Sequence, residues 1–134
     1  MHLGVNHIGF LFPKYEINLR DYLYKQRDPR HLNNILILVG MGIAEMHSMG
    51  YVHRDLKPDS LVLNTKLIEV VIIDFDRTIL DSDDGRGTVL GTPGYFPERE
   101  NLRDGSVKWD IWAYAAIALE ADMKDKKYFA ANRE

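Results

Sequence analysis

Apolar side chains recur every three or four residues along two stretches of the chain, which is the period of an α-helix. From about His31 to Met49 the repeat is carried by Leu32, Ile35, Leu36, Val39, Ile43 and Met46. Apolar residues also fall on the other faces, so we expect a helix buried on most sides and ended by Gly50. The second stretch, Val107–Met123, is almost entirely apolar from Ile111 to Leu119 and predicts a central buried helix.

Shorter elements precede the first long helix. The apolar run His7–Phe12 is stopped by Pro13, and it predicts a short strand. Asn18 stands at a position from which its side chain can cap a short helix that ends at about Lys25.

Two further strands and a loop are expected between the long helices. The apolar runs Ser60–Leu63 and Ile68–Ile73 predict a pair of strands joined by a turn. Residues 74–94 combine many charges with several glycines and predict a long loop, whereas 124–134 form a polar tail.

Composition narrows the class of protein. The 134 residues suit one compact domain, and the net charge of -3 offers no broad basic field for nucleic acid or an anionic membrane. The chain has no cysteine, which excludes disulfide and thiolate chemistry, and its histidines lack metal-ligand spacing. No signal peptide or membrane-spanning run is visible, so we expect an intracellular, cytoplasmic protein.

Four short blocks hold residue types suited to phosphate chemistry. They are Tyr51–Ser60, Asp74–Asp76, Gly91–Glu98 and Asp110–Trp112. In type and order they resemble the catalytic loop, metal motif, end of the activation segment and start of the central helix of a eukaryotic-type protein kinase. A lysine two residues after the aspartate, as in Lys57, resembles the serine/threonine branch. The resemblance covers about residues 7–123.

The resemblance implies a mainly helical, α+β fold: the large lobe of a kinase, with a small β-ribbon carrying the catalytic loop. It divides a partial kinase domain, 1–134, into 7–16 as the last small-lobe strand and hinge, 17–123 as the large-lobe core, and 124–134 as the tail. No Gly-rich phosphate loop or Val-Ala-Ile-Lys-like strand precedes residue 50, so we expect the small lobe to be almost entirely absent. The helices that normally follow the central one are missing too, so we expect that helix to expose an apolar flank.

The resemblance also assigns chemical roles. Asp55 matches the carboxylate that orients the substrate hydroxyl, and Lys57 matches the cation that faces the transferring phosphoryl group. Thr92 matches the threonine that packs beside them and positions the substrate. Asp74 matches a Mg²⁺ ligand, because carboxylate oxygens suit that ion.

Other matched positions are structural in the family: His53, Arg54, Phe75, Glu98 and Asp110. His53, Phe75 and Asp110 would tie the catalytic loop, the metal motif and the central helix together. Arg54 resembles the arginine that receives an activation-loop phosphate, for which Thr88 is the nearest candidate. Asp81, Asp83 and Asp84 would alternatively supply constant negative charge, or simply form a solvated acidic loop.

The sequence departs from the family pattern at several matched positions. Ser60 stands where a second metal ligand, Asn, is usual, and its hydroxyl makes it a weaker candidate ligand. Asp76 replaces a glycine, and it would either add a weak metal ligand or restrict the loop. Phe96 and Ala115 are larger than the usual residues, Ala and Gly, at positions expected to be tightly packed.

The implied function is ATP-dependent transfer of phosphate to serine or threonine of a protein substrate, with ATP and Mg²⁺ as cofactors. Because the small-lobe phosphate anchors are missing from this sequence, we expect the isolated chain not to transfer phosphate. A truncated pseudokinase acting as a binding or regulatory module is the alternative, and a gene remnant without selected function also stays open. The exposed flank predicts a homodimer or a complementing lobe as partner.

Overall fold

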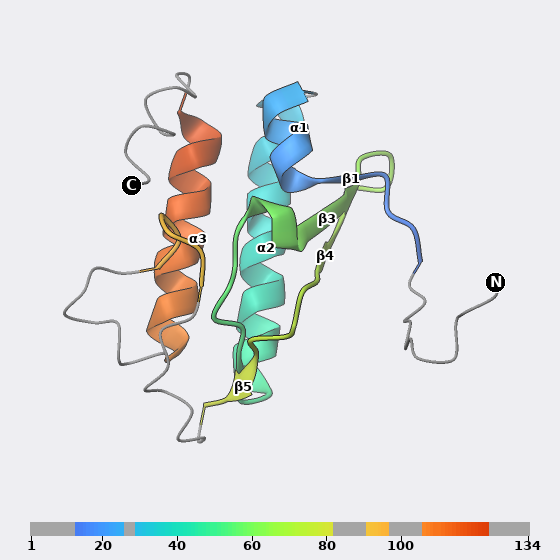
Figure 1. The fold of residues 1–134 in the computed structure, drawn as a ribbon. Helices are drawn as coiled ribbons and strands as arrows, with labels where there is room; N and C mark the ends of the chain where they lie inside the picture. The colour runs from blue at the N-terminus through green and yellow to red at the C-terminus, as the bar shows by residue number, and fades with distance from the viewer. Residues whose placement is uncertain (1–12, 26–28, 82–90, 97–105, 124–134) are drawn as a thin grey trace, which may run out of the picture.

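The computed structural model describes residues 13–25, 29–81, 91–96 and 106–123. Within these ranges it has three α-helices, one short 3-10 helix and two small antiparallel sheets (Figure 1). This mixed α and β content agrees with the predicted α+β class, whereas the assignment to a large lobe alone and its division into parts stay predictions. The predicted strand His7–Phe12 and the tail 124–134 lie outside the described residues.

The first helix, α1 (Leu19–Lys25), begins where the sequence predicts a cap. The Asn18 Oδ1 atom accepts a hydrogen bond of 2.8 Å from the backbone N–H of Asp21, one of the amides that a helix start leaves without an internal partner. The prediction of this cap is therefore confirmed. Leu19, Tyr22 and Leu23 form the buried face of the helix.

The longest helix, α2 (Pro29–Ser48), begins two residues before the predicted start at His31. Proline suits the first turn, because its fixed φ is helical and an amide there needs no intrahelical partner. Gly50 has φ +86 and its N–H donates to the carbonyl of His47 at 2.9 Å, which ends the helix as predicted.

The last helix, α3 (Val107–Asp122), is capped by the hydroxyl of Ser106. One of its faces is buried and consists of Trp109, Asp110, Ala113, Ile117, Glu120 and Ala121. The opposite side is apolar but open to solvent, since Ile111 is 56% and Leu119 is 58% exposed. The predicted exposed flank is therefore present, and the helix is buried on one face only.

The strands form two sheets. The larger sheet contains β1 (Ile17–Asn18), β3 (Leu61–Asn64) and β4 (Glu69–Ile72). The smaller sheet contains β2 (Tyr51–Val52) and β5 (Ile79–Leu80). The predicted β3–β4 pair is confirmed, with Leu61 opposite Ile72. The prediction of an uninterrupted loop over 74–94 was wrong at β5, whose two residues pair with β2 across a long stretch of chain.

The core lies where the three helices meet the larger sheet. In Figure 1, α2 lies between α3 and the strands, and α1 crosses one end of α2. The largest fully buried apolar side chains include Leu19, Tyr22, Val39, Leu56, Leu61, Leu63 and Ile117. Leu56 belongs to the segment between β2 and the 3-10 helix (Pro58–Ser60), so this segment is anchored in the core. None of the helices in the described ranges is long and apolar enough to cross a membrane.

Candidate active site

A buried carboxylate on α3 holds the segment that follows β2. Asp110 is 1% exposed, and its Oδ2 and Oδ1 atoms accept hydrogen bonds from the backbone N–H groups of His53 at 2.8 Å and Arg54 at 2.9 Å. His47 on α2 places its Nε2 atom 2.8 Å from Oδ2. Bonds of this kind compensate for removing a carboxylate from water, and here they join α2, α3 and the loop.

The imidazole of His53 links this loop to the chain after β4. Its Nδ1 atom accepts the backbone N–H of Asp55 at 3.1 Å, and its Nε2 atom lies 2.8 Å from the carbonyl oxygen of Ile73. A carbonyl can only accept and an amide can only donate, so these two contacts assign the neutral tautomer with the proton on Nε2. The ring of Phe75 lies 5.5 Å from that of His53, although Phe75 is 52% exposed.

Arg54 is buried and holds the chain just after Asp76. Its backbone has φ +71, and its Nε–H donates to the carbonyl oxygen of Arg77 at 2.7 Å. Burial lowers the pKa of Arg54, the nearby Arg77 lowers it further, and Asp110 acts in the opposite direction. Thr88, the predicted phosphorylation site whose phosphate Arg54 would bind, lies outside the described residues, as does Glu98.

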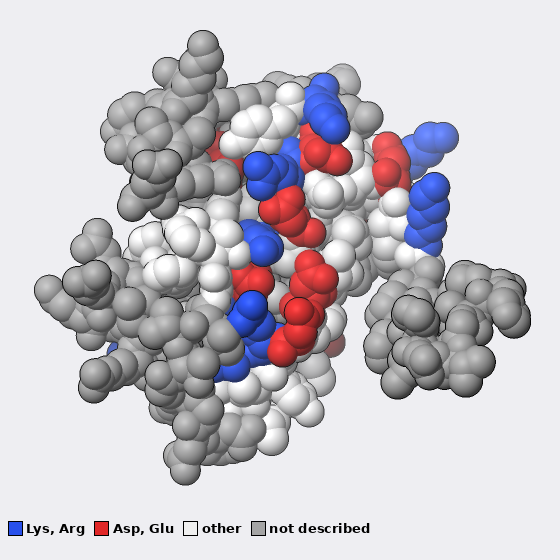
Figure 2. All heavy atoms as spheres, in the orientation of Figure 1, with Lys and Arg blue, Asp and Glu red and all other residues white. Residues whose placement is uncertain are grey.

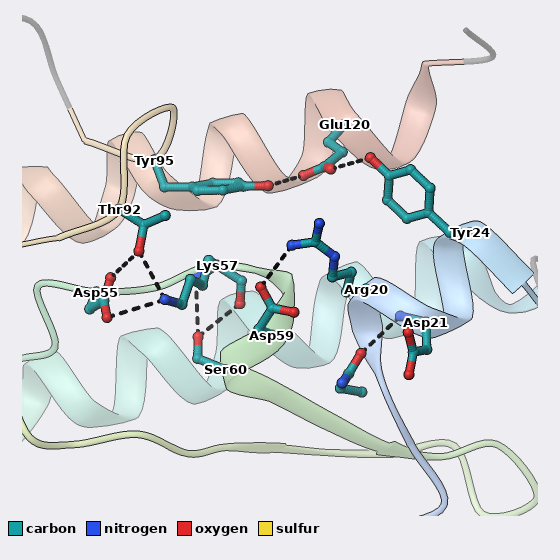
Figure 3. Close-up of polar contacts among 11 residues, drawn as sticks. Arg20, Asp21, Tyr24, Asp55, Lys57, Asp59, Ser60, Thr92, Tyr95 and Glu120 are labelled. Carbon is teal, nitrogen blue, oxygen red and sulfur yellow. Dashed lines mark hydrogen bonds and ion pairs between the residues drawn. The ribbon is translucent and has the colours of Figure 1, made fainter. Parts of the chain in front are cut away.

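Asp55, Lys57 and Thr92, here called the Asp55 cluster, are in direct contact (Figure 3). The hydroxyl of Thr92 donates to Oδ1 of Asp55 at 2.9 Å and accepts from Nζ of Lys57 at 2.9 Å. Nζ of Lys57 also lies 3.5 Å from Oδ2 of Asp55, and Nε of Arg77 lies 4.0 Å from the same oxygen. The structure therefore brings together the two predicted catalytic residues and the predicted positioning residue.

The backbone around Thr92 is a tight turn. Its carbonyl oxygen accepts the N–H of Tyr95 at 3.0 Å. Gly91 has φ +126, and a Cβ atom there would lie 3.2 Å from the carbonyl oxygen of Arg54, so a side chain would strain this approach. The ring of Phe96 stacks on that of Trp109, with the ring centroids 5.9 Å apart. The extra volume of Phe96, compared with the alanine usual in the family at this position, therefore packs against α3.

The predicted metal ligands differ in their exposure to solvent. Ser60 is fully buried, and its hydroxyl donates to the carbonyl oxygen of Lys57 at 2.8 Å and accepts the N–H of Lys57 at 3.0 Å. Asp74, with φ +62, and Asp76 are both exposed. No group of three or more His, Cys, Asp or Glu side chains that could hold a metal occurs among the described residues. The metal roles of these residues stay predictions.

Charged side chains of both signs gather on one face of the molecule. Figure 2 shows them alternating in a band from the level of α1 to the level of β5. Arg20 of α1 forms an ion pair with Asp59, at 3.1 Å between Nη1 and Oδ2. The hydrogen bond to Asp59 raises the pKa of Arg20. The alternation of signs means that this face does not present a field of one sign.

Sequence reasoning missed three residues at the site. In the sequence, His47 is one of several scattered histidines and Arg77 is one of several charges in a loop, and nothing next to either residue indicates its partner. Glu120 does stand out in the sequence, because it is a carboxylate inside an almost wholly apolar helix. It is buried and accepts hydrogen bonds from the hydroxyls of Tyr24, at 2.7 Å, and Tyr95.

Comparisons with known proteins agree with this geometry. A family model described as "Protein kinase domain" matches residues 10–134. The chain is 32% identical over 98 residues to calcium/calmodulin-dependent protein kinase type 1B of Rattus norvegicus, covering 71% of this chain and 28% of that protein. It is 28% identical over 117 residues to serine/threonine-protein kinase nekl-2 of Caenorhabditis elegans, covering 86% of this chain and 32% of that protein.

A fungal relative shows the same pattern. Serine/threonine-protein kinase pakA of Talaromyces marneffei is 35% identical over 81 residues, covering 59% of this chain and 13% of that protein. The chain thus spans less than a third of the length of each of these three relatives. With the family match extending over nearly the whole sequence, this chain belongs to the protein kinase domain family.

Proposed function

We propose that this chain supplies the catalytic loop of a serine/threonine protein kinase that transfers the γ-phosphoryl group of ATP to a protein hydroxyl. The Asp55 cluster is the observation that carries the proposal. Asp55 is the carboxylate that would accept the proton of the attacking hydroxyl, and Lys57 is the cation that would face the phosphoryl oxygens. Thr92 touches both groups and would fix their separation. The relatives named above support this class of substrate.

Among the predicted metal ligands, one side chain is suited to bind Mg²⁺. The carboxylate of Asp74 is exposed, and Mg²⁺ commonly takes one or two protein carboxylates while keeping several waters. Asp74 would therefore hold the ion, which when bound neutralises charge on the phosphates. Ser60 fits less well, because its hydroxyl is buried and bonded to the backbone of Lys57.

The proposal has a limit and an alternative. We expect no transfer by the 134-residue chain alone, because its sequence before residue 50 holds no Gly-rich loop or phosphate-anchoring strand. The alternative is that this chain is a cytoplasmic pseudokinase that binds a protein partner. It is favoured by the engaged hydroxyl of Ser60 and by the exposed apolar flank of α3, on which a second copy or a complementing lobe would dock.

A chimera tests the proposal. The matching segment of the rat kinase named above is replaced by the corresponding segment of this chain, and phosphate transfer to a protein is measured with ATP and Mg²⁺. We expect transfer that Asp55→Asn lowers by about a hundredfold or more, the scale of a general base. The control Asp122→Asn alters an exposed carboxylate and should leave the rate unchanged.

The opposite result would favour the alternative. A folded chimera that stays inactive even with Ser60→Asn and Asp76→Gly would overturn the kinase proposal, since both departures would then have been repaired. Transfer that persists in Asp55→Asn would overturn the role of this carboxylate. The 134-residue chain is assayed in parallel under the same conditions, and activity there would contradict the expected dependence on further parts.

A further inference from the structure

Arg77 is a solvent-accessible cation that lies beside the carboxylate of the Asp55 cluster. Its Nε atom is 4.0 Å from Oδ2 of Asp55, which is too long for a hydrogen bond, and its side chain is 42% exposed. Within the described ranges the guanidinium of Arg77 makes no hydrogen bond, whereas that of Arg20 donates to Asp59 at 3.1 Å. The N–H donors of Arg77 are therefore available to a ligand.

The backbone that carries Arg77 is fixed independently of its side chain. The carbonyl oxygen of Arg77 accepts the Nε–H of the buried Arg54 at 2.7 Å. One residue later, the N–H of Thr78 donates to the carbonyl oxygen of Phe75 at 3.0 Å, which closes a turn over residues 75–78. A charged group on a fixed turn has less freedom to lose when it binds an anion.

Two cations converge on one carboxylate oxygen. Nζ of Lys57 lies 3.5 Å and Nε of Arg77 lies 4.0 Å from the same atom, Oδ2 of Asp55. Figure 3 shows the side of Asp55 that Lys57 approaches. This group of three side chains therefore has an excess of one positive charge. Asp74 and Asp76 are exposed, and in the described part of the chain they pair with neither cation.

A phosphoryl group is the anion that suits this arrangement. A guanidinium is planar and always charged, and its donors can bind two oxygens of a phosphoryl group at once. Lys57 faces the transferring phosphoryl group in the proposed function, and Arg77 approaches the same oxygen of Asp55. An anion with two negative charges would therefore meet both cations.

We propose that Arg77 is a catalytic residue that binds the phosphoryl group during transfer, together with Lys57. The inference rests on the proposed function and deepens it. The hydroxyl oxygen of the protein substrate bonds to the γ-phosphorus of ATP, the bond from that phosphorus to ADP breaks with its electron pair going to ADP, and the hydroxyl proton passes to Oδ2 of Asp55. Arg77 and Lys57 exchange their long contacts with Oδ2 for contacts with the phosphoryl oxygens, which stabilises the charge on those oxygens and leaves Oδ2 open to the proton.

Arginine modification tests phosphoryl binding without any transfer. The 134-residue chain is treated with phenylglyoxal, and mass spectrometry gives the rate of modification at Arg77 and at Arg20. The rates are compared in inorganic phosphate, acetate and chloride at one ionic strength. We expect phosphate to slow Arg77 about fivefold, as for a ligand at about four times its dissociation constant, and to leave Arg20 unchanged. Acetate should have little effect, because it carries one charge.

A lysine variant shows whether the two cations act together. Lys57→Met should remove most of the protection of Arg77 by phosphate, because it deletes the second cation on Oδ2 of Asp55. Lys66→Met is the matched control, since Lys66 is an exposed lysine in the turn between β3 and β4, and it should leave the protection as it is.

The chimera with the rat kinase tests the catalytic part. Arg77→Gln should lower phosphate transfer by about a hundredfold, the scale of one lost donor to developing charge. Arg77→Lys keeps the charge without the planar fork, so its rate should lie between those of the glutamine variant and the parent. The unfolding temperature should not change, because Arg54 binds the backbone of residue 77. Arg20→Gln removes another exposed arginine and should transfer at the parent rate.

Three results would overturn the proposal. The first is no protection of Arg77 by phosphate, and the second is equal protection by acetate or at Arg20, which would mean a general effect of anions. The third is an active chimera in which Arg77→Gln transfers phosphate at the parent rate. An inactive chimera with selective protection of Arg77 would instead contradict the proposed function and support phosphoryl binding, because the protection is measured without ATP or a protein substrate.

Discussion

The substitution Asp110→Asn should destabilise the chain strongly, although it changes only one atom. Oδ1 of Asp110 accepts the N–H of Arg54, and Oδ2 accepts the N–H of His53. An asparagine has one carbonyl oxygen and one amide nitrogen, so in either orientation its NH₂ group faces one of these two N–H donors. A buried backbone donor is then left without its acceptor.

The magnitude follows from these contacts. Losing one charge-assisted hydrogen bond and orphaning its donor inside the protein should cost about 3 kcal/mol together. Urea unfolding followed by circular dichroism measures this loss. With a denaturant slope of about 2 kcal/mol per molar for a domain of this size, the midpoint should fall by about 1.5 M. That is a large part of the stability of a small domain.

A matched substitution on the same helix gives the control. Asp122→Asn removes an exposed carboxylate at the end of α3, and its effect should stay within about 0.5 kcal/mol. If Asp110→Asn also stays within that range, Asp110 does not hold the loop and the reasoning fails. If the slope changes together with the midpoint, the two variants differ in more than stability and the comparison does not apply.

Two further predictions concern elements near the start of the described chain. Asn18→Ala removes the acceptor for the Asp21 amide, so the free energy of unfolding in urea should fall by about 1 kcal/mol; no change would mean that the cap is not needed. Two hydrogen bonds from Thr65, of which the one from its side chain has the larger effect and the other comes from its backbone N–H, lower the pKa of Glu16 below its ordinary 4.5. Its stabilising effect is therefore present above that pH and is lost as pH falls through the lowered value. Glu16→Gln should unfold below the parent temperature at neutral pH and match it in acid, and a difference that persists in acid would contradict this.

Local sequence determined the helices and their ends. The spacing of apolar residues located α2 and α3 to within two residues, because a helix buries side chains at a fixed period along the chain. The cap at Asn18 and the stop at Gly50 follow from side-chain and backbone chemistry within one turn. The order of the kinase-like blocks identified the family, since a motif is written in adjacent residues.

Only the tertiary structure decided which distant groups meet. The family resemblance predicted that Thr92 packs beside Asp55, but no periodicity relates these two residues, and the fold alone sets the hydrogen bond between their side chains. Strand β5 was missed because two residues carry too little pattern, and its pairing with β2 is what defines it. His47 and Arg77 have partners set by the packing of whole elements, which no local signal in the sequence encodes. The sequence does mark Glu120 as a carboxylate in an apolar helix, but only packing decided that Tyr24 and Tyr95 bind it.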